Sequence, residues 1–120
     1  MRIRNANIYT EEHRFVRGDA AVENGRFVSC TGDSAGEEAV VDAEGMYLIP
    51  GLVDIHFHGC KGADMCDGTK EALDVITSYE ASVGVTSVCP ATMTIPKDEL
   101  LEVMKNAGSY EYSGGSHLVG

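Results

Sequence analysis

The chain has 120 residues, of which 43% are hydrophobic, 23% charged and 7% aromatic, with 14 glycines and only 3 prolines. This is the composition of an ordinary soluble protein and argues against long disordered stretches. Nineteen acidic residues against nine basic ones give a net charge of −10, which argues against nucleic acid or an anionic membrane surface as a partner.

The amino terminus lacks the apolar core of a secretory signal, and no window approaches the ~18 apolar residues of a membrane span. We therefore expect a cytoplasmic protein. In that compartment the four cysteines should be reduced thiols that pack as small hydrophobic side chains unless they meet a metal. They are Cys30, Cys60, Cys66 and Cys89.

Residues 1–50 predict a small β unit. The strongest hairpin signal is Asn24-Gly25, because this pair suits the positive φ angles of a type I′ turn. A polar loop, 31–38, separates the hairpin from two shorter strands, and Pro50-Gly51 ends the unit. The expected strands cover residues 2–9, 19–23, 26–30, 39–42 and 46–49.

Residues 51–120 predict the order strand, helix, strand, helix, strand, with right-handed crossovers and parallel strands. Thr69 can cap a first helix over 70–83, and Gly84 ends it. Pro96 suits the first turn of a second helix that Gly108 stops. The residues expected on the buried faces are Ala72, Ile76, Tyr79 and Val83 in the first helix and Leu100, Val103, Met104 and Ala107 in the second.

The most informative segment is PGLVDIHFHGCKG, residues 50–62, which places His56 and His58 two apart at the end of an apolar run. In an extended strand these two side chains point the same way, as does Asp54. Imidazole nitrogens bind first-row divalent cations at about 2.0–2.1 Å, so one strand can supply two ligands. His56 and His58 are therefore predicted metal ligands, and Asp54 is expected either to orient an imidazole or to cap or pair locally.

Two other interpretations of the histidines stay open. An amphipathic strand could simply show solvated histidines to water. Alternatively His56, His58, Cys60 and Cys66 could form a closed structural zinc site, although this stretch lacks the two well-separated ligand pairs of such sites.

The 50–62 segment resembles the first barrel strand of the amidohydrolase superfamily, which carries an apolar Pro-Gly run ending in Asp-x-His-x-His. HGCKGADMCDGT followed by GVTSVCPATMT resembles more narrowly the N-acetylglucosamine-6-phosphate deacetylase family. The resemblance implies an α/β fold in which 1–50 is part of a β-sandwich and 51–120 begins a (β/α)₈ barrel.

A complete barrel needs about 250 residues, so we expect this chain to be a truncated, amino-terminal portion. The apolar run His117 to Gly120, with no polar tail behind it, suggests a cut inside a fold. In the family the next residues form a Glu-Gly-Pro motif whose glutamate binds metal, and two further histidines and the catalytic aspartate follow. We therefore expect no catalytic residue within the chain.

By resemblance, the whole enzyme is a hydrolase of amino-sugar catabolism that converts N-acetylglucosamine 6-phosphate to glucosamine 6-phosphate and acetate. It implies a divalent metal, Zn, Fe, Mn or Co, which would activate water and polarise the amide carbonyl. The expected partner is a small phosphorylated amino sugar. Unpaired strands of an incomplete barrel also suggest a homo-oligomer.

The alternatives are another amidohydrolase, such as a dihydroorotase or an amino-acid deacylase, and a non-catalytic β-rich binding module. Other polar residues near the motif have weaker expectations. Asp67 and Thr69 are expected to cap the first helix, and Lys61 is a weak phosphate candidate. His13 and His117 are not expected to bind metal.

Overall fold

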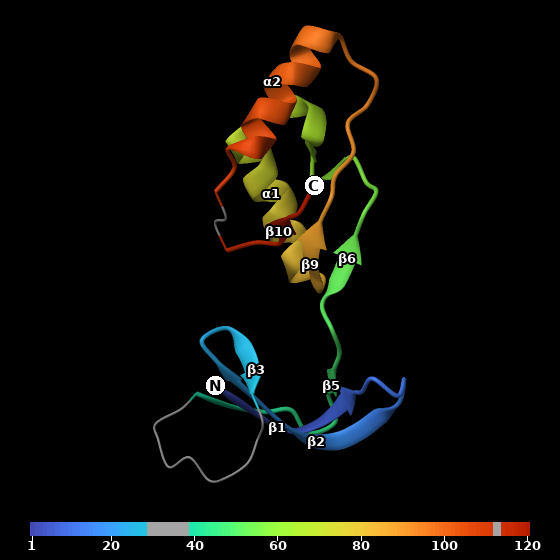
Figure 1. Cartoon of the computed structure of the whole chain (residues 1–120), viewed down its shortest axis with the longest axis vertical. Helices are drawn as coiled ribbons and strands as arrows, with labels where there is room; N and C mark the ends of the chain where they lie inside the picture. The colour runs from blue at the N-terminus through green and yellow to red at the C-terminus, as the bar shows by residue number, and fades with distance from the viewer. Residues whose placement is uncertain (29–38, 112–113) are drawn as a thin grey trace. The chain divides into compact units, whose positions relative to one another are not determined.

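The computed structural model describes residues 1–28, 39–111 and 114–120 and divides into two compact units, Met1–Pro50 and Gly51–Gly120. Cys30 and the end of the predicted strand 26–30 lie outside the described residues. The fold is mixed α/β, with a β-sheet in the first unit and helices beside a parallel sheet in the second (Figure 1). In the part of the chain that the structure describes, no helix could span a membrane.

The first unit is a five-stranded sheet built around its first strand, β1, which pairs antiparallel with β2 and parallel with β4 and β5. Strand β3 extends the sheet beyond β2. The strands are β1 (Arg2–Tyr9), β2 (Phe15–Glu23), β3 (Arg26–Val28), β4 (Val40–Asp42) and β5 (Tyr47–Leu48). The predicted hairpin is confirmed, since Asn24 and Gly25 both have positive φ, 50° and 74°.

A bulge in β1 is held by polar side chains. Asn5 has a φ of 61° between paired residues Ile3 and Ala6. Its backbone N–H donates to Oδ1 of Asp19 and its side-chain amide to Oδ1 of Asp42, each at 3.0 Å. The first of these hydrogen bonds satisfies a backbone N–H at the bulge, and the second connects the bulge to β4. Apolar side chains of this unit line a shallow groove, namely Ile8, Tyr9, Ala20, Phe27, Leu48, Ile49 and Pro50.

The second unit has a three-stranded parallel sheet in the order β10-β9-β6, with helices α1 and α2 in the two crossovers (Figure 1). This confirms the predicted alternation of strands and helices. A hairpin and a 3₁₀ turn between β6 and α1 were not predicted. The elements are β6 (Leu52–Asp54), β7 (Gly59–Cys60), β8 (Ala63–Asp64), η1 (Met65–Asp67), α1 (Lys70–Ser82), β9 (Val85–Val88), α2 (Lys97–Gly108) and β10 (His117–Leu118).

Helix α1 begins as predicted, because the Thr69 hydroxyl accepts the Ala72 N–H at 3.2 Å, and Gly84 turns the chain after it with a φ of 91°. The predicted buried stripe is wrong in part. Val83 is 52% exposed, since it caps the helix where the chain turns away. The buried residues are Ala72, Leu73, Ile76, Thr77 and Glu80.

Helix α2 has Pro96 as its N-cap and ends at Gly108, the residue predicted to stop it. Of its predicted apolar face, Val103 is buried, whereas Met104 is 46% exposed. Helix α2 packs against η1 and α1, and Val103 belongs to the core that these elements share.

The core of the second unit holds Met65, Leu73 and Val103. A polar connection joins α1 to the start of β10. The fully buried Ser116 hydroxyl donates its one proton to the Val85 carbonyl at 2.6 Å, and the Thr77 carbonyl, 3.1 Å from the same hydroxyl, accepts the Ser116 backbone N–H at 2.8 Å. Buried hydroxyls are tolerated when they are paired in this way, so β10 is fixed beside β9.

Candidate functional site

The candidate site lies beyond the carboxyl end of β6. The β6–β9 ladder ends at Asp54, whose carbonyl accepts the Cys89 N–H at 2.8 Å. The next link joins the Ala91 N–H to the Phe57 carbonyl at 2.7 Å. Three residues on one side are thus spanned by two on the other, and the chain must bend after Asp54 to take up the extra residue.

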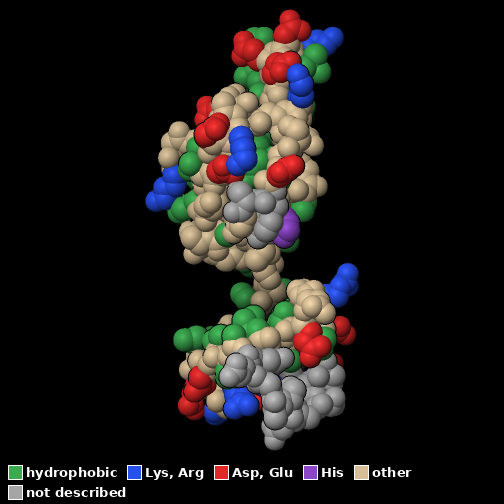
Figure 2. Space-filling view, turned by 90° about the vertical axis from the view of Figure 1, so that its left-hand side faces the viewer, with side chains coloured by type: hydrophobic (Ala, Val, Ile, Leu, Met, Phe, Trp, Pro, Cys, Tyr) green, Lys and Arg blue, Asp and Glu red, His purple; other side chains and the backbone are tan. Residues whose placement is uncertain are grey.

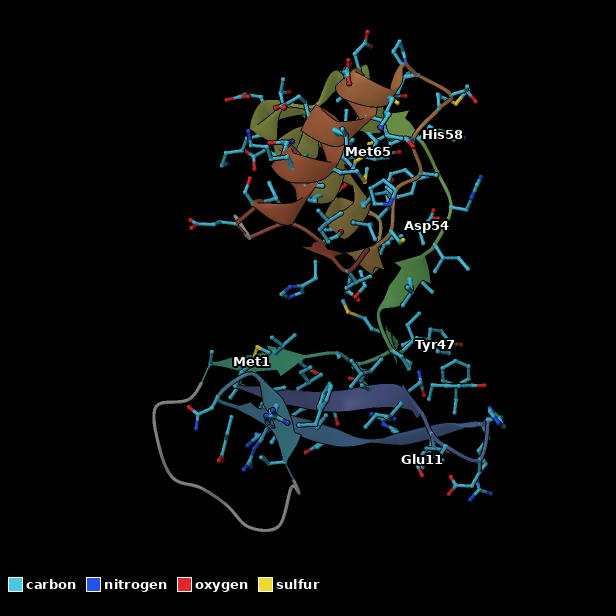
Figure 3. All side chains as sticks on the ribbon, turned by 45° about the horizontal axis from the view of Figure 1, so that its top comes forward. Met1, Glu11, Tyr47, Asp54, His58 and Met65 are labelled. Atoms are coloured by element: carbon cyan, nitrogen blue, oxygen red, sulfur yellow. The ribbon has the colours of Figure 1, made fainter. Side chains whose placement is uncertain are left out.

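The Asp54 side chain forms this bend, because its Oδ1 accepts the backbone N–H of His56 at 3.0 Å. Of the two roles expected for Asp54, the local capping role is the one observed. The expectation that His56 and His58 end the strand itself is wrong: β6 stops at Asp54, and both histidines lie in the irregular segment after it. Figure 3 shows His58 on this segment, beyond Asp54.

The two imidazoles nevertheless come together. Their ring centroids are 5.5 Å apart and their planes cross at 77°. Two imidazoles on one ion at the usual metal–nitrogen distance, with tetrahedral angles, have centroids about 5 Å apart. The rings of His56 and His58 are therefore separated by nearly the distance that one shared cation requires.

The His58 ring is half-buried and fixed, in contrast to the exposed His56. Its Nδ1 lies 2.8 Å from the carbonyl oxygen of Ala91. A carbonyl can only accept, so Nδ1 carries a proton, and the tautomer that this contact selects for a neutral ring has its lone pair on Nε2. This backbone partner selects the tautomer that a metal ligand needs, which argues against a merely solvated histidine at position 58.

The donor set fits part of a metal site. Among residues 1–28, 39–111 and 114–120, no group of three or more His, Cys, Asp or Glu side chains is placed to hold a metal ion. The closed zinc site of His56, His58, Cys60 and Cys66 is therefore wrong. Instead the Cys66 sulfur accepts the Met93 N–H at 3.1 Å. The described residues thus offer a pair of imidazoles.

The 3₁₀ turn η1 carries a capping box that was not predicted. The Asp64 Oδ1 accepts the Cys66 N–H at 2.7 Å, and Asp67 Oδ2 accepts the Asp64 N–H at 2.9 Å. The predicted role of Asp67 as a cap of α1 is wrong, because its carboxylate serves η1. The spacing of two acids three residues apart is a signal that could have revealed this turn.

Other predicted polar residues have contacts of their own. The Lys61 ammonium lies over the Tyr79 ring, 4.7 Å from its centroid. His13 contacts the Tyr9 hydroxyl in the first unit, and His117 is exposed in β10. Acidic side chains gather where α2 begins (Figure 2) and border a cleft lined by Cys66, Asp67, Gly68, Asp98, Glu99, Glu102 and Val103.

Cys60, two residues after His58, is expected to be a slow nucleophile. Burial raises the pKa of its thiol, the buried Glu80 carboxylate raises the pKa further, and Lys61 opposes them. A raised pKa leaves less thiolate at a given pH. At pH 8, iodoacetamide should therefore modify Cys60 more slowly in the folded chain than in the urea-unfolded chain. Peptide mass spectrometry across a pH series measures this.

Glu80→Gln separates charge from access in that experiment. Removing the carboxylate should shift the pH profile of Cys60 alkylation to lower pH, while steric access stays the same. A profile that matches the unfolded chain in both forms would contradict the raised pKa.

No protein-family model matches the sequence. The N-acetylglucosamine-6-phosphate deacetylase of Bacillus subtilis (strain 168) is 28% identical over 122 residues, covering 98% of this chain and 31% of that protein. The Vibrio furnissii protein of the same name is 32% identical over 75 residues, covering 61% of this chain and 19% of that protein. A Lactobacillus gasseri dihydroorotase is 32% identical over 105 residues, covering 86% of this chain and 23% of that protein.

A solved structure shows the same fold. The crystal structure of N-acetylglucosamine-6-phosphate deacetylase from Pasteurella multocida aligns with a TM-score of 0.82 and 23% identity, over 99% of this chain and 34% of that one. The chain thus spans between a fifth and about a third of the length of the relatives described. These matches confirm the predicted relationship: the chain is homologous to the amino-terminal part of the N-acetylglucosamine-6-phosphate deacetylases, in the amidohydrolase superfamily.

Proposed function

We propose that the protein to which these residues belong is a metal-dependent hydrolase that removes the acetyl group of N-acetylglucosamine 6-phosphate. The observation that carries the proposal is the pair of imidazoles 5.5 Å apart beyond β6, with Nδ1 of His58 engaged by the Ala91 carbonyl. Relatives named for this reaction, from two organisms, support the choice of substrate.

His56 and His58 would hold the divalent cation, for which Zn, Fe, Mn and Co are candidates. When bound, such a cation supplies a water of lowered pKa and polarises the amide carbonyl. The chain's own residues prepare the ligands. Asp54 folds the turn that brings His56 beside His58, and the Ala91 carbonyl keeps the His58 proton on Nδ1.

We further propose that Gly51–Gly120 provides the first three strands of a (β/α)₈ barrel and that Met1–Pro50 contributes to a β-sandwich. The parallel order of β6, β9 and β10 supports the barrel. The remaining metal ligands, the proton-transferring base and the phosphate contacts then come from further polypeptide. The net charge of −10 supports the assignment of the phosphate contacts to further polypeptide, because residues 1–120 together repel a negatively charged phosphate.

A dihydroorotase is the second candidate, because the Lactobacillus gasseri enzyme matches 86% of this chain. Both reactions hydrolyse an amide bond, so the histidine pair fits either one. The substrates differ in the phosphate and the sugar ring, and these are recognised by residues other than His56 and His58. Only turnover of the whole protein separates the two.

The test is expression of the complete reading frame that contains residues 1–120, followed by assays with N-acetylglucosamine 6-phosphate and with dihydroorotate. We expect acetate release from the sugar phosphate, loss of activity after chelation and its return with added metal. The variant His56→Ala/His58→Ala should be inactive. Turnover of dihydroorotate alone, or full activity of the double variant, would refute the proposal.

Residues 1–120 by themselves are expected to be inactive, because two ligands cannot complete the site. Acetate release by this purified chain, prepared from a host that lacks its own deacetylase, would contradict the assignment of the missing groups to further polypeptide.

A further inference from the structure

The segment that follows β9 is fastened to the candidate site at every second residue and runs alongside the segment after β6 (Figure 1). Two of its amides, at Cys89 and Ala91, donate to backbone carbonyls, as in an extended strand. The third, at Met93, donates to the sulfur of Cys66 at 3.1 Å. A thiol side chain therefore takes the place of a strand partner at the last point of attachment.

His58 is held both by the segment after β9 and by the residues next to Cys66. Ala91, two residues before Met93, gives its carbonyl to Nδ1 of His58, and Met65, next to Cys66, donates its N–H to the His58 carbonyl at 2.8 Å. Three hydrogen bonds thus form a closed path through His58, Met65-Cys66 and Ala91 to Met93. We call this path the His58 network.

Cys66 is itself held firmly in place. It lies in η1, its N–H is taken by Asp64, and its neighbour Met65 is only 4% exposed. Gly68 ends the turn with a φ of 61°. A sulfur on such a short, capped turn has little freedom to follow Met93, so Met93 must adapt to the sulfur.

We propose that Cys66 is a positioning residue for His58. Its thiol sulfur holds Met93 and so keeps the Ala91 carbonyl against Nδ1 of His58, which presents Nε2 to a cation. The part of this inference that concerns a cation depends on the proposed function. The part that concerns the position of the proton on His58 does not. Sulfur is a weak acceptor and Met93 is exposed, so the bond contributes little to stability and acts mainly on geometry.

The first measurement is the tautomer of His58 in the metal-free chain, read from ¹⁵N chemical shifts of the imidazole. In the unaltered chain the neutral form of the ring should have its proton on Nδ1. Cys66→Ala should give a mixture of tautomers, and Cys66→Ser should recover part of the Nδ1 form because a hydroxyl can accept from Met93. Cys60→Ala, the matched control, should leave the signal unchanged.

The second measurement is a Co²⁺ titration of the same four proteins. Cys66→Ala should weaken binding by about 10-fold, as loss of a supporting partner does at other metal sites. An unchanged His58 tautomer in Cys66→Ala overturns the proposal. So does a thiolate-to-cobalt charge-transfer band that disappears with Cys66, since the sulfur would then be a ligand. A tautomer shift without Co²⁺ binding by any form upholds the positioning role and counts against the proposed metal function instead.

Discussion

Gly59→Ala is expected to open the β7–β8 hairpin and to lower the free energy of unfolding by about 3 kcal/mol. A Cβ at this position would lie 2.1 Å from the Ala63 carbonyl oxygen and 2.7 Å from Cα of Asp64. Both atoms belong to the backbone that pairs with β7, so no side-chain rotation can make room. Urea unfolding followed by circular dichroism measures the change.

Gly108→Ala is the matched control for this substitution. A Cβ at Gly108 meets nothing within 4 Å, and the residue lies in the last turn of α2. Alanine is favoured over glycine in a helix, so this variant should be slightly more stable, by up to about 1 kcal/mol. Equal unfolding midpoints for Gly59→Ala and the unaltered chain would contradict the steric argument.

Gly59→Ala should also disturb the candidate site, because His58 immediately precedes it. Opening the hairpin displaces Met65, whose N–H donates to the His58 carbonyl. Faster hydrogen exchange at the Met65 amide would report this displacement separately from global unfolding. Gly59 is thus expected to be required because the two backbone segments of the hairpin leave no room for a Cβ atom.

Local signals account for the elements that the sequence predicts well. Asn24-Gly25 specifies its turn by φ angles, Thr69 caps α1 with its own hydroxyl, and Gly84 ends the helix region. Each depends on atoms within a few residues. The β7–β8 hairpin has strands of two residues, too short for an alternating pattern. Its turn is Lys61-Gly62, with φ angles of 53° and 81°, and a lysine stands where such turns usually have asparagine or aspartate.

A buried residue of helix α1, Thr77, is polar and is therefore missed by the apolar pattern. A pattern of apolar residues omits Thr77, which is 1% exposed, because its burial depends on partners distant in sequence. Its hydroxyl lies 3.1 Å from that of Tyr110, and its carbonyl accepts from Ser116. Such contacts form only when the crossover returns to α1, so single-sequence periodicity cannot show them.

The histidine pair was found from a two-residue spacing, although the structure reaches the expected proximity by another route. Strand alternation stops at Asp54, and a bend closed by the Asp54 carboxylate brings the rings together. The partner that fixes His58 is a backbone carbonyl, at Ala91, and a main-chain group leaves no mark in the residue types. The sequence therefore indicates the candidate ligands more readily than the hydrogen-bonding groups that hold them in place.

Removing either histidine is expected to abolish chelation of Co²⁺ by the two rings. The affinity for Co²⁺ should fall by more than the roughly 10–100-fold that is typical when a residue supporting a metal ligand is removed. Two imidazoles on one ion bind cooperatively, so His56→Ala and His58→Ala should each leave a single weak ligand. The double variant should then be little weaker than either single variant.

Independent binding gives a different pattern. If each ring bound its own ion, the two losses would add and the wild-type chain would take up two ions of similar affinity. His13→Ala is the control, because His13 lies in the hairpin of the first unit and contacts Tyr9. Calorimetric titration distinguishes the cases by stoichiometry as well as affinity. Non-additivity with one bound ion is what rings 5.5 Å apart predict, and it is the behaviour that a shared cation demands.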